Sequence, residues 1–261
     1  MKNPRDVTRS DVIRMLAIGL IASAVGIALG LWIDWFPTDA SSQAGPIDTF
    51  YDVVMIISVI VFVFVTTLVL FMVWKFRMRA GEEDLDGPPI HGNTRLEVVW
   101  TAIPSIVIAV LCVYAVNVLG EIDEAQANQV QVGVYAQQFA WDFEYTAPNG
   151  KKFLNEELYM SCTPTGSDKR PGAPCKGPQV AFNVKAVDVI HDFWIPEMRM
   201  KTDAVPGITT HVKMNPNRLG DYSVVCAELC GIGHGIMRAN VHVVPPAQYA
   251  AWVAKAATKK S

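Results

Sequence analysis

Three long apolar stretches without a charged residue constrain the fold more than any other feature of this chain. They cover residues 15–33, 53–74 and 98–120, and the shortest contains 19 residues. A helix of that length crosses about 30 Å of hydrocarbon, whereas a helix buried in a soluble core rarely continues as far without a charge. The sequence therefore predicts a membrane-anchored protein, with a two-helix transmembrane anchor over residues 48–120.

The first stretch has two interpretations. Basic residues precede it, as in a signal peptide, and Ser42-Gln43-Ala44 before Gly45 resembles a cleavage site. Its apolar core is longer than the about 7 to 15 residues of a signal peptide, however, and the candidate site lies well beyond that core. We therefore expect residues 1–47 to form an uncleaved span and an outer loop, with a cleaved signal peptide as the alternative.

The positions of Lys and Arg predict the orientation of the spans, because cytoplasmic loops carry the excess of basic residues. Residues 34–52 contain no Lys or Arg. The segments at the other ends of the spans contain Lys2, Arg5, Arg9, Arg14, Lys75, Arg77, Arg79 and Arg95. Everything after residue 120 is therefore expected on the periplasmic, outer side of the plasma membrane.

The charge balance argues against nucleic acid as a partner. The chain has 22 Lys and Arg against 25 Asp and Glu, a formal net charge of -3, and so lacks the basic surface that a polyphosphate backbone needs. Charged residues make up only 18% of the sequence, below the roughly 25% of soluble domains. The lipid bilayer is the partner that this composition predicts.

Residues 121–245 have the pattern of an all-β domain, because short runs rich in β-branched and aromatic residues alternate with Gly, Pro and Asn. The runs predicted as strands are residues 130–135, 180–189, 207–214 and 240–244. Residues 161–178 are rich in Pro and Gly and are expected to form a surface loop. A helix over 247–257, followed by Lys259 and Lys260, is predicted within the C-terminal segment 246–261.

One short segment concentrates metal-binding side chains in the spacing C-x-E-x-C-x-x-x-H-x-x-M. Its members are Cys226, Glu228, Cys230, His234 and Met237. Thiolate, imidazole and thioether groups are soft ligands that suit copper. A mononuclear blue-copper site needs a single Cys, so the second Cys indicates two copper ions bridged by two thiolates. His191, after the strand expected at 187–190, supplies the second imidazole.

The remaining ligands and two alternatives follow from the same segment. Met237 is expected to be a weak axial ligand of one ion, and the backbone carbonyl of Glu228 a ligand of the other. One alternative is a disulfide between Cys226 and Cys230, but a disulfide would not explain why His234 and Met237 follow at ligand spacing. A structural zinc site needs no Met and usually has its Cys residues in a different spacing.

Four motifs make the chain resemble subunit II of the haem-copper cytochrome c oxidases, which carries a dinuclear copper centre called CuA. They are residues 96–101 with Pro104, residues 138–145, residues 188–191 leading to 201–207, and the copper segment. The resemblance implies a transmembrane helical hairpin followed by a cupredoxin-like Greek-key β-barrel over residues 121–245. It also implies that the six copper ligands are His191, Cys226, Glu228, Cys230, His234 and Met237.

The resemblance implies further roles for single residues. Trp141 matches the surface tryptophan that admits electrons from cytochrome c, although without the resemblance it could equally be a strand aromatic packed in the barrel. The carboxylate of Glu228 is expected to bind magnesium shared with subunit I. Glu97 matches a glutamate at the mouth of a proton channel of subunit I, although a glutamate at a helix boundary is often only solvated.

The function implied is that of subunit II of a proton-pumping cytochrome c oxidase. Electrons from a soluble or membrane-bound cytochrome c pass through the copper centre to haem in subunit I, where oxygen is reduced to water. Subunit III is a further expected partner, and because no haem-attachment C-x-x-C-H occurs, the donor must be a separate protein. The alternative is a membrane-tethered copper carrier. A quinol oxidase subunit II would lack the copper ligands.

The other cysteines have separate interpretations. Cys162 and Cys175 lie in the Pro- and Gly-rich insertion on the oxidising side of the membrane, so we expect a disulfide, with two free thiols as the alternative. Cys112 lies inside the third apolar stretch and is expected to be unpaired and inert.

Overall fold

The computed structural model describes residues 7–78, 80–81 and 91–258, and it divides into two compact units. One unit contains the long helices up to residue 34 and over 49–116, and the other contains residues 35–48 and the chain from 117 onward. Of the basic residues named above, Lys2, Arg5, Arg79, Lys259 and Lys260 lie outside the described residues.

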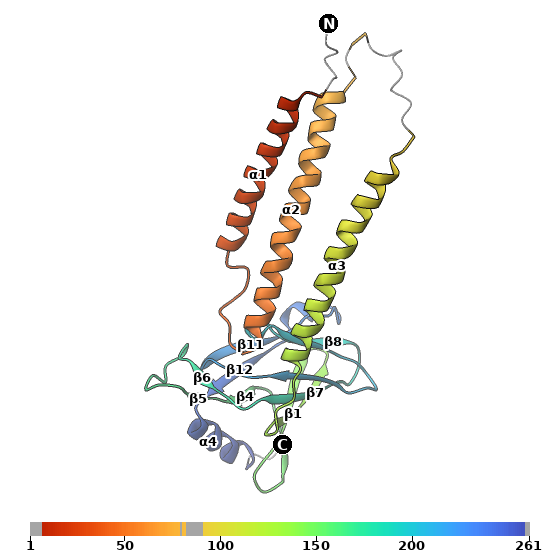
Figure 1. Cartoon of the computed structure of the whole chain (residues 1–261). Coiled ribbons are helices and arrows are strands. Elements are labelled where there is room, and N and C mark those ends of the chain that lie inside the picture. The colour runs from red at the N-terminus through yellow and green to blue at the C-terminus, as the bar shows by residue number, and fades with distance from the viewer. Residues whose placement is uncertain (1–6, 79, 82–90, 259–261) are drawn as a thin grey trace. The chain divides into compact units, whose positions relative to one another are not determined.

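Three long helices cover the apolar stretches, as predicted (Figure 1). They are α1 (Arg9–Trp32), α2 (Ala44–Phe76) and α3 (Thr94–Ile122). Their most apolar 18-residue windows have mean hydropathies of 2.3, 3.1 and 2.4, so each is long and apolar enough to cross a membrane. Each helix extends beyond its apolar stretch because polar residues at its ends can reach the headgroups.

Small residues allow α1 and α2 to pack closely in antiparallel fashion. A Cβ atom added at Gly30 would lie 2.6 Å from the sulfur of Met55, and one added at Gly26 would lie 2.9 Å from Val59. At the other end of the pair, Lys75 and Asp11 form an ion pair of 2.9 Å. Helices in lipid associate through such close contacts, because burying apolar surface away from lipid gains little.

The second unit is a β-sandwich, so the predicted membrane-anchored all-β fold class is confirmed. One five-stranded sheet has the order β10-β7-β1-β2-β3 and the other has the order β4-β12-β11-β8-β9. The first sheet consists of β1 (Val130–Gln137), β2 (Ala140–Thr146), β3 (Lys152–Asn155), β7 (Val180–Ala186) and β10 (Thr210–Met214). The second consists of β4 (Leu158–Ser161), β8 (His191–Ile195), β9 (Met200–Ala204), β11 (Gly220–Cys226) and β12 (Arg238–Val244).

Alternating side chains of both sheets fill the space between them. On β2 the residues Trp141, Phe143 and Tyr145 are buried while their neighbours in the strand are not. Burial of each such side chain stabilises the fold by roughly 1.5–3 kcal/mol. The C-terminal helix α4 (Pro246–Ala256) closes one side of this unit, and its Trp252 stacks on Tyr159 with ring centroids 4.1 Å apart.

The insertion differs in part from the surface loop that was expected. A short ribbon of β5 (Thr163–Pro164) and β6 (Cys175–Lys176) draws its ends together, and a disulfide joins Cys162 to Cys175 as predicted. Both cysteines are buried, because the bridge packs into the hydrophobic core. Most of the insertion is exposed, including residues 165–172, so it lies largely at the surface as predicted.

The loop before α2 belongs to the β unit. We call residues 35–43 the strap. Ala40, Ser41 and Gln43 of the strap are buried. The Ser41 hydroxyl donates to the carbonyl of Met198 at 2.9 Å, and the Gln43 amide donates to the Asn215 side chain at 2.8 Å.

Candidate metal centre

His191 is the first residue of β8 and is fully buried. This corrects the prediction that a strand ends at His191, because β7 stops at Ala186 and residues 187–190 form a bend. The bend has a local cause. The Asp188 carboxylate accepts hydrogen bonds from the backbone N–H groups of Val189 and Gln138, both at 2.7 Å. These bonds replace the backbone hydrogen bonds that a continuing strand would make.

The remaining predicted ligands come from the end of β11 and the loop that follows it. We call residues 227–237 the copper loop. Cys226 ends β11, and its backbone N–H donates to the carbonyl of Met237 at 3.2 Å, which closes the loop. Gly231 has φ +137°, a backbone conformation that side-chain-bearing residues rarely adopt. The loop therefore turns sharply enough to return His234 and Met237 to the two cysteines.

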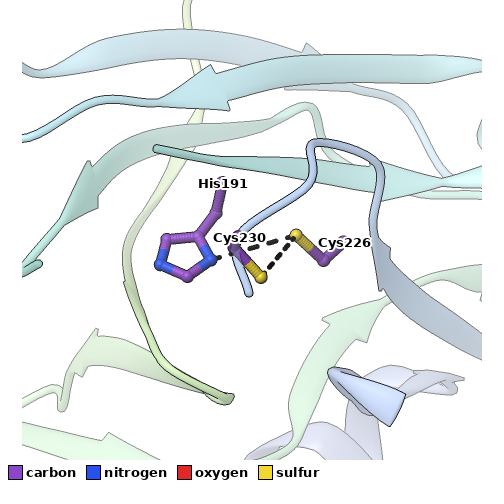
Figure 2. Close-up of side chains that lie close together, drawn as sticks. All are labelled: His191, Cys226 and Cys230. Atoms are coloured by element: carbon purple, nitrogen blue, oxygen red, sulfur yellow. Dashed lines mark hydrogen bonds between the residues drawn. The ribbon is translucent and has the colours of Figure 1, made fainter. Parts of the chain in front are cut away.

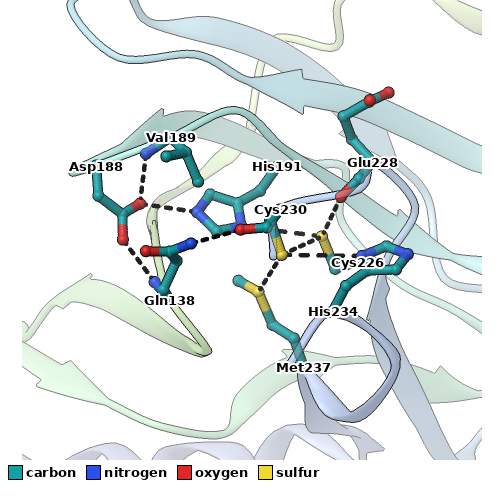
Figure 3. A network of polar contacts seen from close by, with 9 residues as sticks. All are labelled: Gln138, Asp188, Val189, His191, Cys226, Glu228, Cys230, His234 and Met237. Atoms are coloured by element: carbon teal, nitrogen blue, oxygen red, sulfur yellow. Dashed lines mark hydrogen bonds and ion pairs between the residues drawn. The ribbon is translucent and has the colours of Figure 1, made fainter. Parts of the chain in front are cut away.

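The sulfur atoms of Cys226 and Cys230 lie 3.8 Å apart, and both cysteines are free thiols (Figure 2). Each sulfur faces one imidazole. Nδ1 of His191 lies 3.9 Å from the sulfur of Cys226, and Nδ1 of His234 lies 3.8 Å from the sulfur of Cys230. The two imidazoles approach the sulfur pair from opposite sides (Figure 3).

Two further potential ligand atoms lie beside the thiols. The sulfur of Met237 lies 3.8 Å from that of Cys230, and the carbonyl oxygen of Glu228 lies 3.2 Å from that of Cys226 (Figure 3). Each thiol thus has one imidazole and one weaker ligand beside it. This pairing fits two soft metal ions that share the thiols better than one tetrahedral ion, and the thiol, imidazole and thioether set suits copper.

Burial and the neighbouring Cys226 thiol raise the pKa of Cys230 to about 11. Without metal the Cys230 thiol therefore keeps its proton at neutral pH, and a bound metal has to displace it. For Asp188, burial favours the neutral acid, but hydrogen bonds from His191, Gln138 and Val189 outweigh it and lower the pKa to about 2. Asp188 is therefore an anion beside His191.

A second carboxylate follows His191 directly. Asp192 is buried and forms an ion pair of 2.9 Å with Lys201. Burial raises the pKa of Asp192, and the hydrogen bond from Lys201 opposes this shift. Lys201 thus compensates the charge of a buried carboxylate directly beside His191.

Trp141 does not lie on the surface as the resemblance implied. Its side chain is only 2% exposed, because β2 directs it into the core between the two sheets. Its ring packs edge-on against Phe193 and His191, with centroids 5.7 and 6.2 Å apart. Trp141 is therefore a core aromatic in contact with a predicted copper ligand, and its role in electron entry stays a prediction.

Glu97 lies in the first turn of α3, and its carboxylate accepts a hydrogen bond from the backbone N–H of Asn93 at 3.1 Å. The Asn93 side chain in turn accepts from the N–H of Leu96 at 3.2 Å. The two side chains cap the free N–H groups at the start of the helix. Glu228 is exposed and its carboxylate points away from the sulfur atoms (Figure 3).

Two family models cover most of the chain. The model described as the transmembrane domain of cytochrome c oxidase subunit II matches residues 26–118. The model described as the periplasmic domain of the same subunit matches residues 130–244. The chain belongs to the cytochrome c oxidase subunit II family.

Two relatives in sequence agree with this assignment to subunit II. A cytochrome c oxidase subunit 2 of Thermostichus vulcanus is 29% identical and covers 91% of this chain and 83% of its own. The cytochrome c oxidase subunit 2 of Synechocystis sp. is 30% identical, and the match covers 92% of this chain and 81% of the relative. The solved periplasmic domain of subunit II of cytochrome oxidase from Bradyrhizobium japonicum is 23% identical over 52% of this chain and 96% of its own, with a TM-score of 0.41.

As a subunit II, the chain is a component of cytochrome c oxidase, an oxidoreductase, and its role in that complex is electron transfer. It works beside other oxidase subunits in the membrane, with the β-sandwich on the periplasmic side. The family binds copper, and the group of His191, Cys226 and Cys230 has its ligand atoms within 4.8 Å of one another. Gln138 and Asp188 lie in the sequence motifs described above, but sequence reasoning did not give them the role of supporting this group.

Proposed function

We propose that this subunit II holds two copper ions as a CuA centre and passes electrons from cytochrome c to haem in subunit I. The observation that carries the proposal is the pairing of two free thiols 3.8 Å apart with one imidazole beside each. His191, Cys226, Glu228, Cys230, His234 and Met237 would hold the pair, Glu228 through its backbone carbonyl. Bound copper would supply a reversible one-electron couple.

The protein contributes rigidity and exclusion of water. His191, Cys226, Cys230 and Met237 are buried, and they are held by strands of one sheet and by a short loop closed at Cys226. Ligands fixed in this way change position little between two redox states, which favours fast electron transfer. Trp141 would carry electrons from the β1–β2 hairpin toward His191, since its ring packs against that imidazole.

Three further roles belong to the same proposal. The exposed carboxylate of Glu228 would bind magnesium together with subunit I, because it points away from the sulfur atoms. Glu97 would stand at the mouth of a proton channel of subunit I in addition to capping α3. Subunit III and a soluble or membrane-bound cytochrome c would be the remaining partners.

Copper analysis of the purified oxidase tests the proposal. We expect two more copper ions per complex in the wild type than in a Cys226→Ser/Cys230→Ser variant, and loss of rapid reduction by cytochrome c in that variant. Cys112→Ser is the matched control, because Cys112 is a free thiol of α3 and belongs to the helical unit, and it should change neither value. A chain that binds copper but purifies without a haem-bearing subunit would support the copper carrier instead.

A further inference from the structure

The β1–β2 hairpin touches both ligand-bearing segments of the candidate copper centre through one residue, Gln138 (Figure 3). Gln138 lies in the turn between β1 and β2, in the sheet opposite to the one that carries the ligands. Its backbone N–H donates to one carboxylate oxygen of Asp188 at 2.7 Å, and its side-chain amide donates to the carbonyl of Cys230 at 2.5 Å.

These two hydrogen bonds lead directly to ligands. The other carboxylate oxygen of Asp188 lies 2.8 Å from Nε2 of His191, so Asp188 joins Gln138 to the imidazole. The Cys230 carbonyl belongs to the residue whose sulfur faces Cys226, His234 and Met237. Gln138 is thus in contact with the two segments that have to keep a fixed spacing if they are to share metal ions.

The copper loop is shaped to receive the hairpin. A Cβ atom added at Gly231 would lie 2.8 Å from the side-chain nitrogen of Gln138, and one added at Gly233 would lie 2.5 Å from the ring of Phe139. Glycine at these two positions lets the loop lie directly against Gln138 and Phe139. The hairpin and the copper loop are therefore joined by close packing as well as by the hydrogen bond from Gln138 to Cys230.

We propose that Gln138 is a positioning residue that fixes the copper loop relative to His191. This inference rests on the proposed copper function, because the spacing matters only if both segments bind the same metal pair. Gln138 itself is exposed on its outer side, so its replacement leaves no cavity in the core. Loss of a hydrogen bond that supports a metal ligand typically lowers the affinity for the metal by 10- to 100-fold.

Replacement of the amide in the intact oxidase complex tests the role. In Gln138→Leu the backbone N–H to Asp188 remains and the donor to Cys230 is lost. We expect copper to pass to an excess of chelator roughly tenfold faster than in the wild type, with a changed EPR spectrum and reduction potential of the copper centre. Transfer of copper to the chelator should be faster still in Gln138→Glu, because its carboxylate would face the Cys230 carbonyl and repel it.

Gln137→Leu is the matched control, since Gln137 is the exposed neighbour in the same hairpin and its amide donates to Asp142, away from the copper ligands. A second measurement needs no copper. In the chelator-stripped complex, alkylation of Cys226 and Cys230 relative to Cys112 should be about fivefold faster in Gln138→Leu, because the loop loses a hydrogen bond.

The two measurements separate the possible failures. If wild-type oxidase carries no copper in this subunit, the proposed function is wrong, and the alkylation rates still decide whether Gln138 holds the loop. If copper is present but Gln138→Leu matches Gln137→Leu in chelator transfer, EPR spectrum, potential and alkylation, the positioning role of Gln138 is wrong and the copper function stands.

Discussion

Asp188 holds the far side of the His191 ring, with 2.8 Å between its carboxylate and Nε2, while Nδ1 of the same ring faces the sulfur of Cys226. A carboxylate on one ring nitrogen fixes the proton there and leaves the other nitrogen free to bind a metal. The pair thus determines both the tautomer and the direction of the imidazole.

Removal of this carboxylate should weaken the copper centre. In Asp188→Ala the ring of His191 loses its partner, so we expect copper to be lost to a chelator roughly tenfold faster. Asp188→Asn keeps an acceptor oxygen and should lie between Asp188→Ala and the wild type. The control is Asp203→Ala in β9, whose side chain has no hydrogen bond to His191. Equal rates in Asp188→Ala and Asp203→Ala would contradict the role of Asp188.

Trp141 should affect electron transfer separately from copper binding. Trp141→Ala is a poor test, because emptying a fully buried aromatic site costs about 3–5 kcal/mol. Trp141→Phe keeps an aromatic ring in the core and should retain full copper content, while reduction by cytochrome c becomes slower. Stopped-flow reduction and metal analysis of the same preparation measure both. Unchanged reduction at full copper content would show that Trp141 serves only in packing.

The sequence predicted the parts of the protein that depend on neighbouring residues. The three spans follow from uninterrupted apolar residues, and the candidate metal site follows from five candidate ligand residues between Cys226 and Met237. The position of His191 at the start of β8 was not predictable, because the bend before it depends on a hydrogen bond that the backbone N–H of Gln138, fifty positions away, donates to Asp188. The burial of Trp141 likewise depends on its contact with Phe193 in the opposite sheet.

The disulfide between Cys162 and Cys175 should stabilise the β unit. Closing a loop of about this size lowers the conformational entropy of the unfolded chain. This should raise the free energy of unfolding by roughly 3 kcal/mol. We expect Cys162→Ala/Cys175→Ala to lower the thermal unfolding midpoint of the β unit and to leave the copper content unchanged. Peptide mapping without reduction checks the bridge itself. Recovery of the two residues as separately alkylated thiols in the wild type would contradict it.

The strap should remain in the mature chain. Cleavage after Ala44 would remove the buried residues Ala40, Ser41 and Gln43 from the β unit and take from the side chain of Asn215 one of its two amide donors, leaving only Gln179. Intact-mass measurement of the subunit is expected to show that these residues are present. A mature chain that begins at Gly45 would contradict the prediction.

The energetic importance of the strap can be measured separately. Gln43→Ala should lower the free energy of unfolding by about 1–3 kcal/mol, because Asn215 loses two hydrogen bonds at a buried site. Ser42→Ala is the control, since Ser42 is exposed and its hydroxyl makes a long hydrogen bond of 3.4 Å to Gln43. Thermal unfolding of the two variants side by side shows the difference.

EPR spectroscopy of the oxidised complex tests the central claim most directly. If two thiolates bridge two copper ions between His191 and His234, the unpaired electron is shared, and the spectrum should show equal hyperfine coupling to two copper nuclei. Cys226→Ser should abolish this pattern. A wild-type spectrum with coupling to a single copper nucleus in this subunit, or with none, would contradict the dinuclear centre.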